Sequence, residues 1–88
     1  MNELSGLPNL GPTLARELAA AGVDSPVRLR ALGAVEAWER VRQVNAERDC
    51  ASSLLALEGA VRGVRWTRLE RAERDRLTAY ARARRTAR

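Results

Sequence analysis

The residues of this chain best suited to hold a ligand form a turn near the N-terminus, at residues 7–12. Asn and Gly tolerate left-handed backbone, so we expect Asn9 and Gly11, on either side of Leu10, to turn the chain sharply and point backbone N–H groups outward. Pro12 suits the first position of a helix. The positive end of that helix would lie behind the turn, and such an end binds anions. The pattern therefore predicts a phosphate site made of main-chain amides.

The segment around this turn resembles the hairpin of the helix-hairpin-helix family in its order of apolar, turn, glycine and alanine residues. It reads Leu7-Pro8-Asn9-Leu10-Gly11-Pro12-Thr13-Leu14-Ala15-Arg16-Glu17-Leu18. In that family the hairpin holds a DNA phosphate without reading bases. The donors that the resemblance implies are the amides of Leu10, Gly11 and Thr13, the Thr13 hydroxyl and the Arg16 side chain. Arg16 can reach the turn because helical side chains lean toward the N-terminus. The nucleic-acid-binding residues that it implies are Asn9, Leu10, Gly11, Thr13 and Arg16.

The same hairpin has a purely structural interpretation, in which it only connects two helices. Leu7, Leu10 and Leu14 would then lie in the core, and Ala15 would allow close approach of a neighbouring helix. Asn9 stands where the family usually has its first Gly, and Thr13 stands where a basic residue is common. Both interpretations stay open at the level of sequence.

A second feature with chemical potential is the basic C-terminal end. All 16 basic residues are Arg, and the net charge is +5. Residues 1–60 carry six Arg against eight acids, whereas residues 61–88 carry ten Arg against three acids. Such an end can attract a polyphosphate through counterion release, or it can complement the dipole at a helix C-terminus. On the first interpretation, the added nucleic-acid-binding residues are Arg82, Arg84, Arg85 and Arg88.

Catalysis has little support in the composition. Cys50 is the single cysteine and the chain has no His, so the usual metal ligands and the usual general base are missing. We expect no enzyme activity, metal, cofactor or small-molecule substrate. No apolar run approaches the length of a membrane span and the start lacks a leader pattern, so the cytoplasm is the expected location.

Helix signals dominate the elements that must position these residues. Pro12 begins a helix that should end near Gly22, and Ser25-Pro26 begins a short one that should end at Gly33. A third helix is expected over 34–43, followed by a loop over 44–51. Ser52 or Ser53 is expected to cap a fourth helix that ends at Gly63, and a last helix should begin near residue 69 or 70. No segment alternates at period two, so the prediction is an all-α, compact bundle of about five short helices.

Nearly the whole chain also resembles the C-terminal domain of the TfoX (Sxy) family. The motifs that carry this resemblance are Leu7-Pro8-Asn9-Leu10-Gly11-Pro12, Ala21-Gly22-Val23-Asp24-Ser25, Leu29-Arg30-Ala31-Leu32-Gly33-Ala34-Val35 and Leu54-Leu55-Ala56-Leu57-Glu58-Gly59-Ala60 with Trp66 downstream. The resemblance implies five helices with a helix-hairpin-helix-like start. It also implies a role in natural competence or as a transcriptional coactivator. The expected layout is a lead-in at 1–6, the domain at 7–81 and an Arg-rich tail at 82–88. Family regulators typically carry a preceding domain, whereas this sequence starts directly at the C-terminal one. A stand-alone copy is therefore expected, and its role can differ from competence control.

Two functions of different kinds follow. The first is a non-catalytic regulatory module that contacts DNA phosphates. The second is a module that binds a regulatory protein or a second copy of itself, with a structural hairpin. The second rests on apolar residues that a small monomer is expected to leave partly exposed, namely Trp38, Trp66 and Val64.

Overall fold

Proline and glycine set most of the helix boundaries in the computed structural model, which describes residues 3–86. Pro12 and Pro26 are the first residues of two helices, and Ser25 caps the second because its Oγ accepts the Arg28 amide at 3.2 Å. Gly33 (φ 83°) forms the corner between the second and third helices. These boundaries confirm the sequence prediction.

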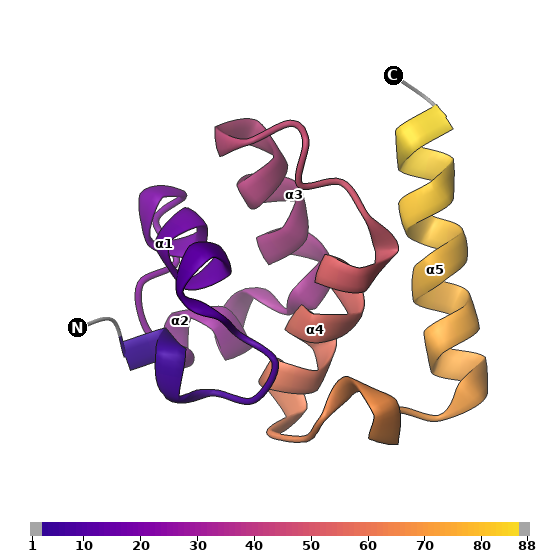
Figure 1. Ribbon diagram of the computed structural model, residues 1–88, viewed down its shortest axis with the longest axis horizontal. Coiled ribbons are helices and arrows are strands. Elements are labelled where there is room, and N and C mark those ends of the chain that lie inside the picture. The colour runs from indigo at the N-terminus through magenta and orange to yellow at the C-terminus, as the bar shows by residue number, and fades with distance from the viewer. Residues whose placement is uncertain (1–2, 87–88) are drawn as a thin grey trace.

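Within the described residues the chain forms five α-helices and two 3-10 helices, with no strand (Figure 1). They are η1 (Glu3–Gly6), α1 (Pro12–Ala20), α2 (Pro26–Leu32), α3 (Ala34–Val44), α4 (Ala51–Arg62), η2 (Trp66–Arg68) and α5 (Arg71–Thr86). The predicted all-α bundle is confirmed. None of these helices is long and apolar enough to cross a membrane.

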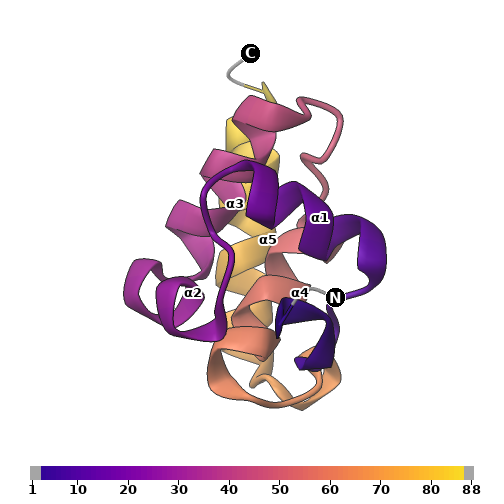
Figure 2. The same cartoon turned by 90° about the vertical axis from the view of Figure 1, so that its left-hand side faces the viewer.

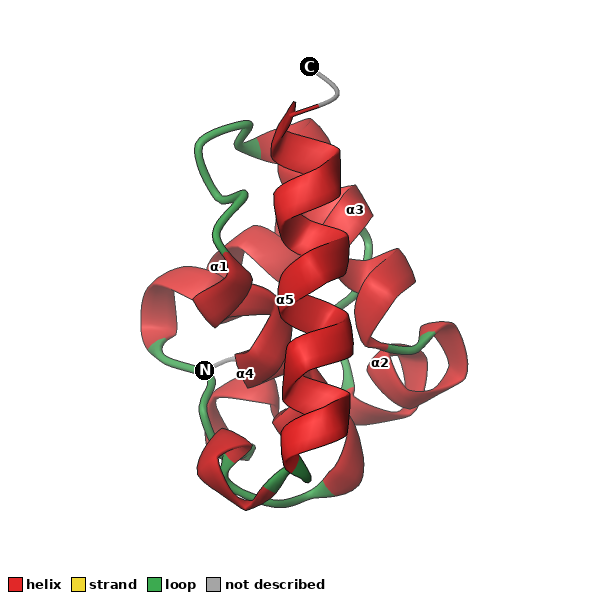
Figure 3. Cartoon of the chain, turned by 90° about the vertical axis from the view of Figure 1, so that its right-hand side faces the viewer, coloured by secondary structure: helices red, strands yellow, loops and turns green. Residues whose placement is uncertain are grey.

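The core lies where α3 meets its neighbours. α3 packs against α1, α2 and α4, and α4 packs against α5 and η2. Viewed from the side of α5, that helix runs along one face of the bundle with the shorter helices behind it (Figure 3). Leu4 of η1 is fully buried, so part of the expected N-terminal lead-in belongs to the core.

The start of α4 differs from the prediction. Cys50 occupies the N-cap position, and neither expected serine caps the helix. Ser53 instead is buried, accepts the indole N–H of Trp38 at 3.0 Å and donates to the Cys50 carbonyl at 2.8 Å. A buried indole N–H needs an acceptor, and Ser53 supplies it. Trp38 is fully buried, so the expectation that it stays partly exposed is wrong, whereas Trp66 is 41% exposed.

The C-terminal end of the described chain is helical. α5 continues through Thr86, so residues 82–86 of the expected tail extend this helix. Tyr80 fastens α5 to α3, since its hydroxyl donates to Glu39 Oε2 at 2.7 Å and its ring meets Trp38 edge-on at 6.0 Å between centroids. The guanidinium group of Arg42 lies over the Trp38 ring, with its Cζ 4.9 Å from the ring centroid.

Candidate nucleic-acid interface

The hairpin turn has one left-handed residue and not two. Asn9 adopts φ 72°, as expected, but Gly11 has φ −80° and ψ 173°. The expectation of a left-handed Gly11 is wrong because Gly11 is the N-cap of α1, a position that takes extended backbone. Its carbonyl accepts the amide of Ala15 at 3.0 Å, which is the first helical bond.

The amides at the start of α1 are open. No side chain caps this helix, and within residues 3–86 the amides of Leu10, Gly11 and Thr13 have no hydrogen-bond acceptor. Gly11, Pro12 and Thr13 are exposed, while the Leu10 side chain is buried in the core. The unpaired amides of the exposed residues Gly11 and Thr13 are therefore open to solvent at the positive end of a helix, where an anion can be accommodated, whereas Leu10 is buried.

The side chain of Asn9 forms hydrogen bonds within the protein, so its amide group is not directed toward a phosphate. Its Nδ2 donates to the carbonyls of Val64 at 2.9 Å and Ala56 at 3.5 Å, and its Oδ1 accepts the amide of Trp66 at 3.1 Å. We call this set of bonds the Asn9 bracket. It depends on Gly59, because a Cβ there would lie 2.7 Å from the Val64 carbonyl. Asn9 thus ties the hairpin to the connection between α4 and α5.

Arg16 is an exposed cation that forms no ion pair in the described part of the chain. The adjacent Glu17 is engaged by Arg48, with Nε 2.8 Å from Oε1, and by Asn45, with Nδ2 2.7 Å from Oε2. Burial raises the pKa of the Glu17 carboxyl, but the bonds from Asn45 and Arg48 outweigh it and hold the pKa below its usual value. The charge of Arg16 also helps to lower this pKa, but Arg16 forms no ion pair among residues 3–86.

The arginines of the C-terminal end are engaged differently. Arg84 Nε lies 2.7 Å from Glu39 Oε2, and Arg85 Nε lies 3.7 Å from Asp49 Oδ2. Arg82 is exposed on the same helix, and Arg88 lies outside the described residues. Arg84 and Arg85 therefore help to fasten α5 to the bundle, which makes them less available to a polyphosphate.

Sequence reasoning missed two other arginines. Arg65 and Arg68 are exposed, flank Trp66, and form no ion pair within the described part of the chain. The signal was present, since arginines recur every third residue from Arg65 to Arg71 around a tryptophan. The acidic residues that follow in α5 offset these arginines in a count of charge along the sequence, and such a count does not show which ion pairs form.

Arg65 lines a hollow next to the hairpin. The hollow has a volume of about 340 Å³ and is lined by Asn9, Ser52, Leu55, Ala56, Arg65 and Trp66. The N-terminal segment and the connection from α4 to α5 lie at the same end of the molecule (Figure 2). The Asn9 bracket thus brings the hairpin next to Trp66, and Asn9, Arg65 and Trp66 line the same hollow.

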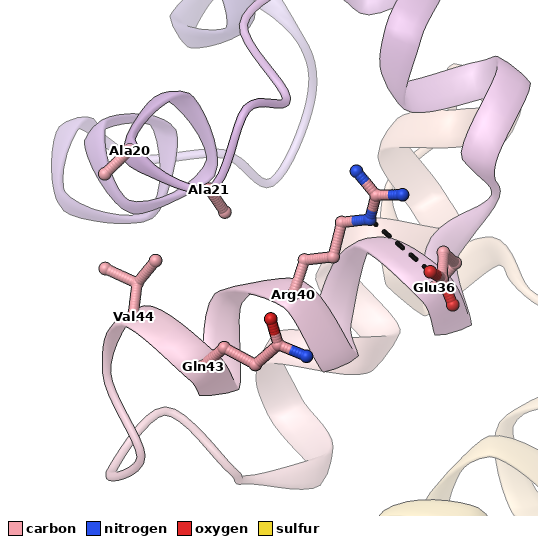
Figure 4. Close-up of a pocket in the computed structure, with 6 residues that line it drawn as sticks. All are labelled: Ala20, Ala21, Glu36, Arg40, Gln43 and Val44. Atoms are coloured by element: carbon pink, nitrogen blue, oxygen red, sulfur yellow. Dashed lines mark hydrogen bonds and ion pairs between the residues drawn. The ribbon is translucent and has the colours of Figure 1, made fainter.

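A second hollow is a poorer anion site. It has a volume of about 480 Å³ and lies between the end of α1 and α3 (Figure 4). Its arginine, Arg40, is paired with Glu36, with 3.4 Å between Nε and Oε1. The end of α1 also presents carbonyl groups, whose partial negative charge repels anions. Among residues 3–86 no group of three or more acidic, Cys or His side chains could hold a metal ion.

The fold and the open hairpin define a small all-α domain with a helix-hairpin-helix-like start. The chain belongs to the TfoX C-terminal domain family, whose model matches residues 1–81. The fold is also similar to two crystal structures of Listeria monocytogenes proteins. One, an uncharacterized protein in a triclinic form, is 40% identical with a TM-score of 0.87 and covers 91% of this chain and 90% of its own. The other, a protein of unknown function in a tetragonal form, is 41% identical with a TM-score of 0.85 and covers 91% of this chain and 96% of its own. No curated protein matches the chain.

Proposed function

We propose that this domain is a non-catalytic regulatory module that associates with DNA through sequence-tolerant phosphate contacts. Its setting would be competence or transcription regulation in the cytoplasm, as the family resemblance implies. The observation that carries the proposal is the group of unpaired amides at the start of α1, of which those of Gly11 and Thr13 belong to exposed residues and that of Leu10 to a buried one. Arg16, Arg65 and Arg68 support it, since each is an exposed cation without an acid partner among the described residues.

Such an interface would position DNA without reading its sequence. Amides and guanidinium groups that contact phosphate oxygens carry no base information. The affinity should then fall steeply with salt, because each neutralised phosphate releases a counterion. With three to five phosphate contacts, raising the salt from about 50 to about 200 mM would weaken binding by roughly 40- to 500-fold.

The test is a DNA titration at these two salt concentrations with the intact chain and with Gly11→Asp. The extended backbone of Gly11 and the open space around its missing Cβ fit an aspartate N-cap. This variant should be more stable by a few tenths of a kcal/mol. Its carboxylate would nevertheless occupy the amides and repel phosphate, so we expect at least a tenfold loss of affinity.

Gln43→Glu is the matched control, because it makes the same change in net charge on the exposed face of α3. It should alter affinity by less than about twofold, as expected for a screened remote charge. Absence of salt-dependent binding by the intact chain would remove the proposal. Equal losses in the two variants would mean that net charge, and not the hairpin, attracts DNA.

A protein-interaction module is the second candidate, favoured by exposed apolar side chains. Val27 is 72% exposed and Val44 is 48% exposed. Sedimentation over a range of concentrations tests self-association directly. A monomer at all concentrations would argue against a second copy as the partner, while a dimer broken by Val44→Asp would support it.

A further inference from the structure

The hollow beside the hairpin is lined by both apolar and polar residues. Leu55 and Ala56 of α4 contribute apolar side chains, Asn9, Ser52 and Arg65 contribute polar ones, and Trp66 completes the lining. Its volume of about 340 Å³ is within the usual range for small-ligand pockets. A planar, partly polar group would fit these surroundings better than an aliphatic chain.

Trp66 is held in place by its backbone and not by its ring. Its amide donates to Asn9 Oδ1 at 3.1 Å, while its side chain stays 41% exposed. By contrast, the ring of Trp38 is fully buried and its N–H is paired with Ser53. Trp66 thus presents an aromatic surface on a fixed main chain, so little conformational freedom would be lost when a ring stacks on it.

The charges around Trp66 indicate the nature of the ligand. Arg65 and Arg68 lie on either side of it in the chain, and neither forms an ion pair with a described residue. The open amides at Gly11 and Thr13 begin two residues beyond Asn9. An aromatic ring between phosphate-binding groups is the arrangement that proteins use for single-stranded nucleic acid.

We propose that this surface binds single-stranded DNA, with one unpaired base in the hollow stacked on Trp66. The hairpin amides, Arg65 and Arg68 hold phosphates of the same strand. A base within a duplex is stacked between its neighbours and does not reach such a hollow, so the geometry selects the single strand. The inference rests on the proposed phosphate contact and adds the class of DNA that is bound.

Intrinsic fluorescence tests the proposal, because Trp66 is the exposed one of the two tryptophans. The intact chain is titrated at about 50 mM salt with a single-stranded thymine oligonucleotide and with a duplex of the same length. We expect the single strand to quench Trp66 emission and to bind more tightly than the duplex. The duplex should bind through phosphates and leave the emission unchanged.

Two variants separate stacking from folding. Trp66→Leu keeps an apolar side chain and the backbone bond to Asn9, but removes the aromatic face. Its affinity for the single strand should fall about 5- to 150-fold, the range measured for one base on one aromatic ring, while its affinity for the duplex changes less than about twofold. Trp66→Tyr should restore most of the lost affinity.

The outcomes distinguish the inference of base stacking from the proposed phosphate contact on which it rests. If neither DNA binds, both fall. If the duplex binds as tightly as the single strand and Trp66→Leu changes neither affinity, the phosphate contact stands and the stacking inference is overturned. Equal losses for both DNAs in Trp66→Leu would also overturn it, since Trp66 would then only shape the surface.

Discussion

At the scale of single residues, Asn9 shows how one residue can carry two structural tasks. Its left-handed backbone turns the hairpin, and its amide group ties that turn to residues 56, 64 and 66. The turn was predictable, because Asn is one of the few residues that tolerate this conformation. The bracket was not, since no periodicity in the sequence relates a turn residue to carbonyls so far along the chain.

Substitutions at Asn9 separate these two tasks. Asn9→Gly keeps the left-handed turn but leaves the Val64 carbonyl and the Trp66 amide without partners, so the free energy of unfolding should fall by about 1–3 kcal/mol. Asn9→Ala should lose about 1–2 kcal/mol more, because alanine also strains the backbone there. Urea denaturation measures both changes. A glycine variant as stable as the intact chain would show that the bracket contributes nothing.

At the scale of elements, one carboxylate of α3 holds several side chains of the α3–α5 contact. Glu39 of α3 accepts from Tyr80 and pairs with Arg84 and Arg42, the latter with 2.8 Å between Nη1 and Oε1. Burial raises the pKa of the Glu39 carboxyl, but the bonds from Tyr80, Arg84 and Arg42 outweigh it and hold the pKa below its usual value. The ionised form of Glu39 therefore favours the folded chain.

This shift gives a pH dependence with a definite sign. A carboxylate whose pKa is lowered on folding stabilises the chain above the unfolded value of about 4.3, and this contribution is lost as the pH falls through the folded value. The intact chain should lose stability between about pH 5 and pH 3, and Glu39→Gln should lose less over that range. At pH 7 the variant should be less stable by about 1–3 kcal/mol.

Denaturant unfolding at pH 7, 5 and 3 measures this difference. Glu47→Gln is the control, because Glu47 is exposed in the loop after α3, and its pH profile should match that of the intact chain. The part of the dependence that survives in Glu39→Gln is expected from Glu17, whose pKa is also lowered. Parallel profiles for the intact chain and Glu39→Gln would contradict the assignment.

The same scale shows why helix ends were easier to predict than the start of α4. Pro12, Pro26, Gly33 and Gly63 act through their own backbone preferences, which the sequence displays directly. Ser53 had the same local preference for a cap position, but its hydroxyl accepts a hydrogen bond from the buried indole N–H of Trp38 instead. A tertiary contact of this kind overrides a local signal and leaves no trace in the nearby residues.

At the scale of the whole molecule, ion pairs decide which charges remain available. In the described residues they engage Arg28, Arg40, Arg42, Arg48, Arg62, Arg76, Arg84 and Arg85. The excess of positive charge in residues 61–88 identified the basic end of the chain. It could not show that Arg84 and Arg85 meet acids of distant segments while Arg65 and Arg68 do not.

The difference between paired and unpaired arginines predicts how DNA affinity depends on salt concentration. In the double variant Arg65→Gln, Arg68→Gln, the slope of log affinity for DNA against log salt should be shallower by about 2 units, because two phosphate contacts are lost. Arg84→Gln should leave the slope unchanged and reduce the free energy of unfolding by about 1 kcal/mol, as its partner Glu39 keeps other donors. The opposite pattern would return the DNA contact to the C-terminal helix.

The Asn9 bracket also bears on the order in which the molecule assembles. Its three hydrogen bonds join groups that are 47, 55 and 57 positions apart. Closing so long a loop is entropically unfavourable until α3 and α4 already hold the chain together. The hairpin should thus become fixed late in folding, and during synthesis only after residue 66 has left the ribosome. A nascent chain would carry the amides of its N-terminal turn before it could hold them in their final orientation.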